Sequence, residues 1–456
     1  MTSSRRHFLG VAGASLGVPL LAAQAHPAAQ KTSSNDKIQI ALIGCGGQGQ
    51  SDTKTAASTG LTKVVAACDC YDGRLEHMKE QYGRDIFTTK RYQEILDRKD
   101  IDAVLIGTPD HWHQPIAIAA MKAGKDVYCE KPMVHAVEEG HAVVDTQRQT
   151  GRILQVGSQR VSSVVYAKAR DLFRQGAIGE LNMAEAWYDR NSAVGAWEYT
   201  VPLDADTTTC DWPQFQGDAP KTDWDPHRFF RWRCYRDYGT GVAGDLWVHL
   251  FSGLHFITSS LGPERVYTTG GLRFWKDGRD VPDVMVGLFD YPKTAQHPAF
   301  NLAMRTNFVD GGEENQGFRF IGSKGVMTVG RDVTLSASPE EGEPGLTIGT
   351  FANKTQDEIK KAYAAKYPHS QYNPNYRPTA GSMRPDRHQV FSAPPRYNDQ
   401  YDHVLNWAHA VRSRKPVVED AAFGFRAAGP ALLSNMSYFE KKIVRWDPVN
   451  MKLVGA

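Results

Sequence analysis

The order of apolar and polar positions predicts alternating strands and helices in the first third of the chain. Short apolar runs of strand length recur there, and each is separated from the next by a stretch that suits a helix. The expected strands are residues 37–43, 63–68, 103–106, 126–129 and 152–156, and the expected helices start at residue 50 and span 73–81, 114–123 and 137–150. Such alternation predicts a parallel, doubly wound sheet that binds ligands at the carboxyl ends of its strands.

The pattern changes beyond residue 160, where strand-like segments follow one another without regular helices between them. The expected strands are residues 180–189, 264–267, 284–291, 302–308, 317–322 and 325–329. We therefore expect a second domain of α+β type with a mostly antiparallel sheet. Residues 336–397 are rich in Pro, Gly and charge. They predict a loop-rich insertion with one short helix over 356–366, covering a cleft or a neighbouring subunit.

The N-terminus has the pattern of an export signal. Arg5 and Arg6 precede a Gly/Ala-rich apolar run that reaches Leu21, and Ala23-Gln24-Ala25 supplies a small-x-small cleavage pattern. Residues 1–25 are thus expected to be a twin-arginine signal peptide and 26–36 a polar tether, with a periplasmic or otherwise exported product. The apolar run is too short for a stable membrane anchor; an uncleaved N-terminal anchor is the alternative.

A glycine-rich turn directly follows the first expected strand. Its sequence is GxGxxG, in which Gly44 permits the tight turn, Gly46 lets a pyrophosphate approach the backbone, and Gly49 allows close packing of helix and strand. The cofactor-binding residues expected here are Gly44, Gly46, Gly47, Gln48 and Gly49.

Asp69 ends the second expected strand, about 20–25 residues beyond the glycines. A carboxylate at this place can accept hydrogen bonds from both hydroxyls of an adenosine ribose, and it repels a 2′-phosphate. NAD is therefore expected rather than NADP, although Arg74 weakens that preference slightly. A structural glycine turn beside a surface aspartate is the alternative. The predicted class is α/β, with an NAD-binding Rossmann domain over 37–159 and a substrate-binding and oligomerisation domain over 160–456.

Motifs at the later strand ends resemble the Gfo/Idh/MocA (glucose-fructose oxidoreductase / inositol dehydrogenase) family. They are Gly-Thr-Pro at 107–109, His113, Ala-Gly-Lys-Asp-Val at 123–127 and Glu-Lys-Pro at 130–132. The resemblance covers residues 37 to about 330 and a helix around 404–414. It implies that Lys131 is catalytic beside the nicotinamide and that Glu130 lies on the cofactor side. We expect Thr108, Pro109 and His113 near the cofactor as well, and the resemblance implies a dimer or tetramer formed through the open sheet face.

A second pair of residues resembles the Asp-x-x-x-His motif of the same family. Asp245 and His249 follow a glycine-rich stretch, and positions i and i+4 share one face of a helix. The carboxylate could then tune a histidine that takes the hydroxyl proton as hydride leaves carbon. Lys131, Asp245 and His249 are the expected catalytic set. An exposed helical pair or a satisfied buried histidine is the alternative.

Arg160, Arg231 and His255 are candidate substrate contacts. The aromatic and Arg-rich block 224–235 could stack on a sugar ring and reach its oxygens, or it could pack a subunit interface. The segment 110–113 contains two histidines and a carboxylate but no further ligand nearby, so no metal is expected there. Asp110 is expected instead to be a helix N-cap.

Charge and composition narrow the function classes. The net charge is +2, which gives no electrostatic case for nucleic-acid binding. The expected partner is a small carbohydrate, and the predicted function is an exported NAD-dependent oxidoreductase acting on a sugar, polyol or glycoside with a tightly bound cofactor. Free dinucleotide is scarce outside the cytoplasm, which is why a retained cofactor is expected. Two alternatives remain: an NAD-dependent glycoside hydrolase working by transient oxidation, elimination and re-reduction, and a non-catalytic sugar-binding protein.

Overall fold

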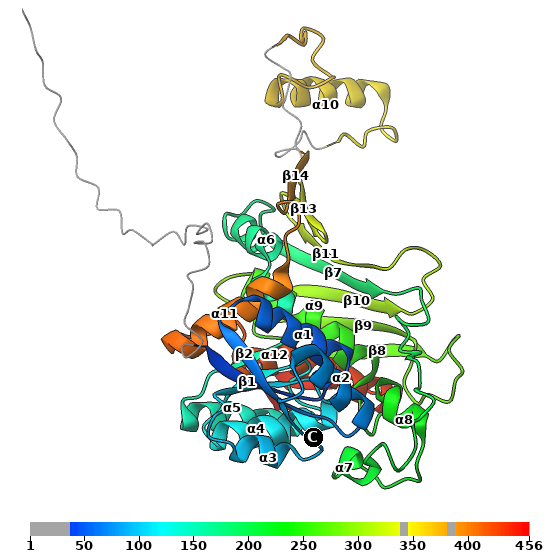
Figure 1. The fold of residues 1–456 in the computed structure, drawn as a ribbon. Coiled ribbons are helices and arrows are strands. Elements are labelled where there is room, and N and C mark those ends of the chain that lie inside the picture. Colours follow the sequence, from blue (N-terminus) through cyan, green and yellow to red (C-terminus); the bar gives the residue numbers. More distant parts are fainter. Residues whose placement is uncertain (1–36, 338–344, 381–387, 456) are drawn as a thin grey trace, which may run out of the picture.

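The computed structural model describes residues 37–337, 345–380 and 388–455. The expected signal peptide and tether lie outside these residues. Two sheets, each covered by helices, form the body of the molecule (Figure 1). Within the described ranges, the helices are too short or too polar to cross a membrane.

The N-terminal domain is a six-stranded parallel sheet in the order β3-β2-β1-β4-β5-β6. Its strands are β1 (Ile38–Ile43), β2 (Thr62–Cys68), β3 (Phe87–Thr89), β4 (Ala103–Ile106), β5 (Asp126–Cys129) and β6 (Leu154–Val156). Its helices are α1 (Gly47–Ser58), α2 (Asp72–Tyr82), α3 (Tyr92–Asp97), α4 (His113–Lys122) and α5 (Gly140–Thr150). Strands covered on both faces are mostly apolar, as β4 is, so the sequence predicted five of these six strands and missed only the three-residue β3.

A helix from the far end of the chain completes this domain. α11 (Asp399–Ser413) packs beside α1, and Trp407 and Val404 lie fully buried in one apolar cluster with strand residues such as Ile40. The Trp407 indole donates to the carbonyl of Val127 at 3.1 Å. The nucleotide domain is therefore built from two segments of chain, one of which lies within the range assigned above to the second domain.

The second domain is a ten-stranded sheet in the order β14-β13-β12-β11-β7-β10-β9-β8-β15-β16. Its neighbours are antiparallel except for β7 and β10, which confirms the predicted mostly antiparallel sheet. The strands are β7 (Leu181–Asp189), β8 (Arg265–Gly271), β9 (Val284–Tyr291), β10 (Phe300–Asn307), β11 (Asn315–Gly322), β12 (Gly325–Val329), β13 (Asp332–Ala337), β14 (His388–Ser392), β15 (Val444–Asp447) and β16 (Lys452–Leu453).

Helices cover one face of this sheet and join it to the first domain. They are α6 (Val164–Arg174), α9 (Val248–Thr258) and α12 (Ala421–Glu440), with the short α7 (Trp212–Gln216) and α8 (Pro226–Phe230) beside the cleft. α12 contacts α9, β8 and α5, so it bridges the two sheets. α12 also contacts the end strand β6 of the parallel sheet.

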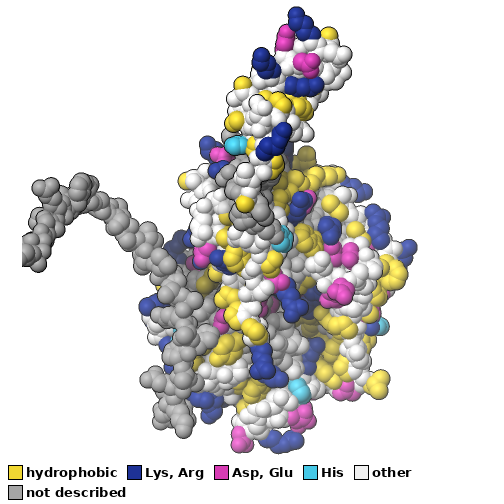
Figure 2. Space-filling view, turned by 90° about the horizontal axis from the view of Figure 1, so that it is seen from above, with side chains coloured by type: hydrophobic (Ala, Val, Ile, Leu, Met, Phe, Trp, Pro, Cys, Tyr) yellow, Lys and Arg dark blue, Asp and Glu magenta, His cyan; other side chains and the backbone are white. Residues whose placement is uncertain are grey.

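The insertion differs from the expected cleft cover. β13 and β14 pair antiparallel and carry α10 (Asn353–Lys366), which stands away from the body (Figure 1). The same arm projects in the second view, and its tip carries both basic and acidic side chains (Figure 2). The short helix was predicted correctly. β14 was missed because its residues are nearly all exposed, so it lacks the apolar alternation that marks a strand.

Candidate functional site

A cleft of about 590 Å³ opens along the carboxyl edge of the parallel sheet, where the second domain faces it. Expected cofactor residues line one part of it, and Lys131, Asp245 and His249 line another. The residues predicted from the strand ends are thus brought into one continuous space. From the second domain it is lined by Tyr188, Arg190, Tyr199, Phe215, Phe229, Phe230, Trp232 and Arg233.

The glycine turn fits a bound pyrophosphate. Gly44 has a φ of 91°, which favours glycine, and a Cβ on Gly49 would lie 2.3 Å from the Gly44 carbonyl oxygen. A Cβ on Gly46 or Gly47, in contrast, would meet nothing within 4 Å. These two glycines leave room beside the N-terminus of α1, where unpaired N–H groups favour an anion.

Asp69 lies beside this turn and is preoriented to receive a ribose. Its Oδ2 accepts from the backbone N–H of Cys45 at 2.7 Å, and its Oδ1 accepts from the N–H of Tyr71 at 2.9 Å. Arg74 approaches the same carboxylate at 3.6 Å. Each carboxylate oxygen keeps a further lone pair for a hydroxyl. The donor set therefore fits the diol of an adenosine ribose.

The ends of β4 and β5 supply the next groups along the cleft. The Thr108 hydroxyl is buried and has no hydrogen-bond partner among the described residues. Glu130 accepts from the Gln159 amide at 2.9 Å, and burial raises the pKa of Glu130 although Lys131 partly offsets this. Both Thr108 and Glu130 line the cleft, as predicted.

Lys131 and Asp245 form a buried ion pair that links the two domains. The Lys131 Nζ donates to Asp245 Oδ1 at 2.6 Å and to its backbone carbonyl at 2.9 Å. Arg233 donates from Nε to the same Oδ1 at 3.2 Å. Burial alone would raise the pKa of Asp245, but Lys131 and Arg233 outweigh burial and hold it well below its usual range. Asp245 is therefore an anion that fixes the lysine at the end of β5.

His249 lies near this pair, and Asp245 raises its pKa as the i, i+4 spacing suggested, but burial and Lys131 outweigh this effect. Asp245 sits in a π-helical turn (Ala243–Trp247), and its carboxylate points to Lys131 and Arg233. Burial lowers the pKa of His249 well below its usual value, and the neighbouring Lys131 lowers it further. The His249 ring is thus neutral at neutral pH. Its Nδ1 is buried without a partner among the described residues, which leaves Nε2 to face the cleft.

His113, expected near the cofactor, and Asp110, expected to be a helix N-cap, instead bond to other segments of the chain. His113 does not line the cleft: its Nδ1 lies 2.7 Å from the Pro132 carbonyl and its Nε2 lies 3.0 Å from that of Thr108. It therefore ties the loops after β4 and β5 together. Asp110 is not a helix cap, because its Oδ2 accepts from the hydroxyl and the backbone N–H of Thr240.

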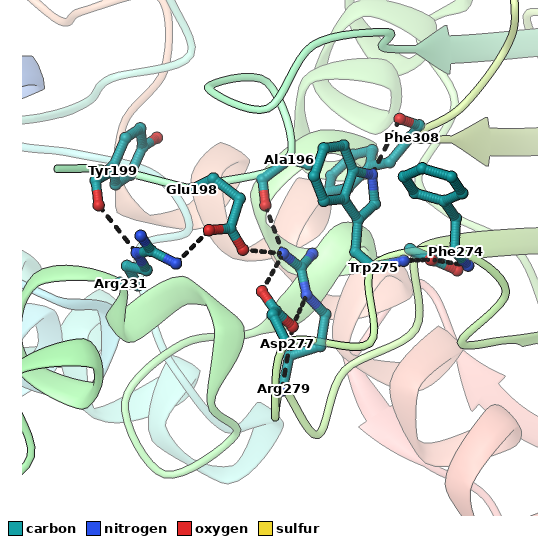
Figure 3. Close-up of polar contacts among 10 residues, drawn as sticks. Ala196, Glu198, Tyr199, Arg231, Phe274, Trp275, Asp277, Arg279 and Phe308 are labelled. Carbon is teal, nitrogen blue, oxygen red and sulfur yellow. Dashed lines mark hydrogen bonds and ion pairs between the residues drawn. The ribbon is translucent and has the colours of Figure 1, made fainter.

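Two of the three expected substrate residues are likewise structural. Arg231 pairs with Glu198 and donates from Nε to the Tyr199 carbonyl at 2.8 Å, in a network continued by Arg279 and Asp277 (Figure 3). It does not line the cleft.

His255 is buried behind the cleft, where its Nε2 lies 3.0 Å from the Tyr291 hydroxyl. Burial lowers the pKa of His255 to about 3. His255 lies in α9, beyond the π-helical turn that holds Asp245, and its side chain is buried in the core. Arg160, the third expected substrate residue, does line the cleft.

The sequence did not single out several residues that line the cleft. Arg190 directly follows β7, a position that could have been flagged as a strand end. Gln400 comes from α11, and its amide donates to Asp52 at 2.9 Å beside the first helix. No local sequence signal indicates that α11 and α1, which are far apart in the chain, lie side by side.

A family model agrees with this geometry over the N-terminal domain. Residues 38–158 match the Gfo/Idh/MocA model, described as an oxidoreductase family with an NAD-binding Rossmann fold. The N-terminal domain is accordingly similar to the NAD-binding Rossmann domain of this oxidoreductase family, and NAD is the cofactor that its turn and Asp69 fit.

Curated relatives match part of the chain. An alpha-N-acetylgalactosaminidase of Shewanella oneidensis is 30% identical over 234 residues, which is 42% of this chain and 49% of the relative. An inositol 2-dehydrogenase of Salmonella paratyphi B is 27% identical over 167 residues, or 36% of this chain and 49% of the relative. The chain thus spans about half the length of these relatives.

The whole fold resembles solved dehydrogenase structures. A levoglucosan dehydrogenase in complex with NADH and levoglucosan is 17% identical, with a TM-score of 0.62 over 90% of this chain and 99% of the other. An oxidoreductase domain protein from Kribbella flavida is 20% identical, with a TM-score of 0.61 over 89% and 98%. At these identities the likeness concerns the fold.

Proposed function

We propose that this protein is an NAD-dependent oxidoreductase that oxidises a CH–OH group of a sugar, polyol or glycoside. The observation that carries the proposal is the placement of Lys131 and His249 in the same cleft as the glycine turn and Asp69. NAD, when bound, supplies the hydride acceptor, so that a CH–OH group becomes a carbonyl and one proton is released.

His249 and Lys131 have separate roles in removing the hydroxyl proton. Nε2 of the neutral His249 accepts the hydroxyl proton, because its lowered pKa keeps it unprotonated at neutral pH. The ammonium of Lys131, fixed by Asp245, stabilises the negative charge that develops on the same oxygen. Tyr188 and Trp232 line the cleft and provide aromatic faces for a sugar ring.

The direct test is Lys131→Met. Turnover should fall at least about a hundredfold, the usual scale for losing one such charge contact, while bound NAD stays near the wild-type amount. The matched control is Lys122→Met, which changes an exposed lysine at the end of α4. Unchanged turnover in Lys131→Met would refute the assignment. Sugar binding without any NADH formation in the wild type would favour the non-catalytic alternative.

A redox-neutral glycosidase is the second candidate, and the match to the alpha-N-acetylgalactosaminidase favours it. In that chemistry the sugar is oxidised transiently, the aglycone is eliminated next to the new carbonyl, water adds, and the hydride returns. A chromogenic aryl glycoside separates the two functions. The glycosidase releases the phenol with no net NADH, whereas the dehydrogenase accumulates NADH and releases no phenol.

We further propose that the protein is exported with its cofactor already bound. The support is Arg5-Arg6 before the apolar run, together with an NAD site that Gln400 lines on the α11 side. NAD(H) should then co-purify in near-stoichiometric amount. A protein that purifies empty and needs millimolar NAD would contradict cofactor retention.

We also propose that copies of this chain assemble through the open face of the large sheet. Tyr267, Val286 and Leu288 are exposed there on β8 and β9. We expect a dimer or tetramer by light scattering, and Leu288→Asp should shift it toward the monomer.

A further inference from the structure

The part of the cleft around His249 has an excess of positive charge. Lys131, Arg233, Arg160 and Arg190 all line the cleft there. Asp245 alone pairs with both Lys131 and Arg233, so one carboxylate serves two cations. These three groups together therefore carry a net charge of +1 before any substrate is bound.

Arg160 and Arg190 add to this excess because neither has an acidic partner. Within residues 37–337, 345–380 and 388–455, neither guanidinium lies within ion-pair distance of a carboxylate, although Arg190 helps to lower the pKa of Asp245 and Asp399 also lines the cleft. Arg190 donates to the Gly195 carbonyl at 2.8 Å and lies 5.3 Å from the Tyr188 ring centre.

Arg160 has a neutral partner as well. The side-chain oxygen of Gln316, in the amide orientation that satisfies both groups, accepts from its guanidinium. Both arginines are half-buried and keep further N–H donors for the cleft.

Both charges act on the position where the substrate reacts. Burial is the main cause that lowers the pKa of His249, and Arg160 and Arg190 each lower it further. Tyr188, over which Arg190 lies, also contacts the His249 ring at 6.2 Å between centres. The two guanidiniums therefore flank the base rather than a remote part of the surface.

The cofactor does not account for this charge. Its diphosphate belongs at the glycine turn, and Arg74 and Lys90, which line that side of the cleft, already pair with Asp69 and Asp72. The oxidised nicotinamide is itself cationic and would lie near Lys131. Binding of NAD thus increases the positive charge that the substrate meets.

We infer that the substrate carries an anionic group, a carboxylate or a sulfate ester, which Arg160 and Arg190 bind while the ring lies against Tyr188. This inference rests on the proposed function and narrows its substrate class to acidic sugars, such as uronic acid or sulfated units. Guanidinium groups suit this task because they offer planar paired donors to carboxylate and sulfate oxygens.

The test compares sugars that share one ring but differ in whether they carry a negative charge. Methyl glycosides of glucuronic and galacturonic acid are titrated against their methyl esters, which have the same ring and no charge. Glucose 6-sulfate against glucose forms the sulfate arm. Binding is followed by NADH fluorescence with protein saturated with NADH, in which an alcohol binds without being oxidised. At least one acid or sulfate should bind at least about tenfold more tightly than its neutral counterpart, the scale of one charged hydrogen bond.

Variants then assign the preference to residues. Arg160→Gln and Arg190→Gln should each reduce the preference for the anion about tenfold, and Arg190→Lys should restore part of it. Arg319→Gln is the matched control, since Arg319 pairs with Glu185 on the large sheet away from the cleft. Its preference should equal that of the wild type, and melting temperatures identify any variant that fails to fold.

The outcomes separate this inference from the function on which it rests. Equal binding of each anion and its neutral counterpart overturns the inference, as does a preference that survives in both Arg160→Gln and Arg190→Gln. Arginine-dependent binding of an acidic sugar, with neither NADH nor phenol formed by NAD-loaded protein, overturns the proposed function instead. Carboxylate preference over sulfate, or the reverse, identifies which oxyanion the site takes.

Discussion

Replacing Asp245 with asparagine tests the buried ion pair at the centre of the site. The amide keeps the shape of the side chain but loses the charge that serves Lys131 and Arg233. Only 9% of the Lys131 side chain and 6% of the Asp245 side chain is exposed, so solvent screens the pair weakly. Removing one partner of such a pair costs about 3–5 kcal/mol in the free energy of unfolding, because an uncompensated charge stays buried.

The assay is urea denaturation followed by tryptophan fluorescence. With an m-value of about 3 kcal/mol/M, that loss lowers the urea midpoint by about 1 M or more. Asp100→Asn is the matched control, because Asp100 pairs with Arg98 at 2.7 Å on the surface, where the side chains are 47% and 34% exposed. Exposed pairs contribute about 0–1 kcal/mol. The reasoning is refuted if Asp245→Asn shifts the midpoint no further than Asp100→Asn.

The pH dependence of the same variant provides a second check. Lys131 and Arg233 outweigh burial, so the pKa of Asp245 in the folded protein lies below the value of about 3.9 in an unfolded chain. A lowered pKa stabilises the fold at pH values above about 4, and that stabilisation is lost as the pH falls through the folded pKa. The stability difference between wild type and Asp245→Asn should therefore be full at pH 7 and should shrink as the pH drops below about 4.

Three further outcomes are expected. Gly46→Ala should fold normally but bind NAD at least about tenfold more weakly, since its Cβ enters open space in the cleft. Gly49→Ala should instead lower the melting temperature, because its Cβ would lie 2.3 Å from a carbonyl oxygen. Equal changes of NAD affinity and melting temperature in the two variants, measured by calorimetry, would contradict these separate roles. Asp69→Ser should weaken NAD by about tenfold and raise the ratio of NADP to NAD affinity, as measured by fluorescence titration. His255→Gln should lower the free energy of unfolding by about 1 kcal/mol, because it loses the hydrogen bond to Tyr291, and should leave kcat/KM unchanged. A large loss of kcat/KM would show that His255 acts on the substrate after all.

The sequence predicted the parallel sheet and the cofactor side of the cleft because both depend on short-range patterns. The glycine turn and Asp69 directly follow apolar strands, and the carboxyl ends of parallel strands must meet at one edge. Lys131 was placed in the same way, at the end of β5.

What the sequence missed depends on packing between distant segments. α12 was not predicted, because Gly424, Gly429 and Pro430 suggest helix breaks. In the fold these small residues permit close approach: a Cβ on Gly424 would lie 2.5 Å from Val156. The arginines show the same limit, since Arg231 and Arg233 are two residues apart but only Arg233 reaches the cleft. The sequence around Arg231 and Arg233 does not indicate which of the two side chains reaches the cleft.

The return of α11 to the first domain has a consequence for biosynthesis. All six strands of the parallel sheet have been synthesised by residue 156, yet the apolar surface that receives Trp407 and Val404 stays uncovered until residue 413 is made. Domains that are contiguous in sequence can fold as soon as they emerge, whereas a domain closed by its own C-terminal helix cannot. Nearly the whole chain must therefore be synthesised before the dinucleotide domain is complete. A translation product that stops short of α11 would expose this surface and be a substrate for chaperones or proteases.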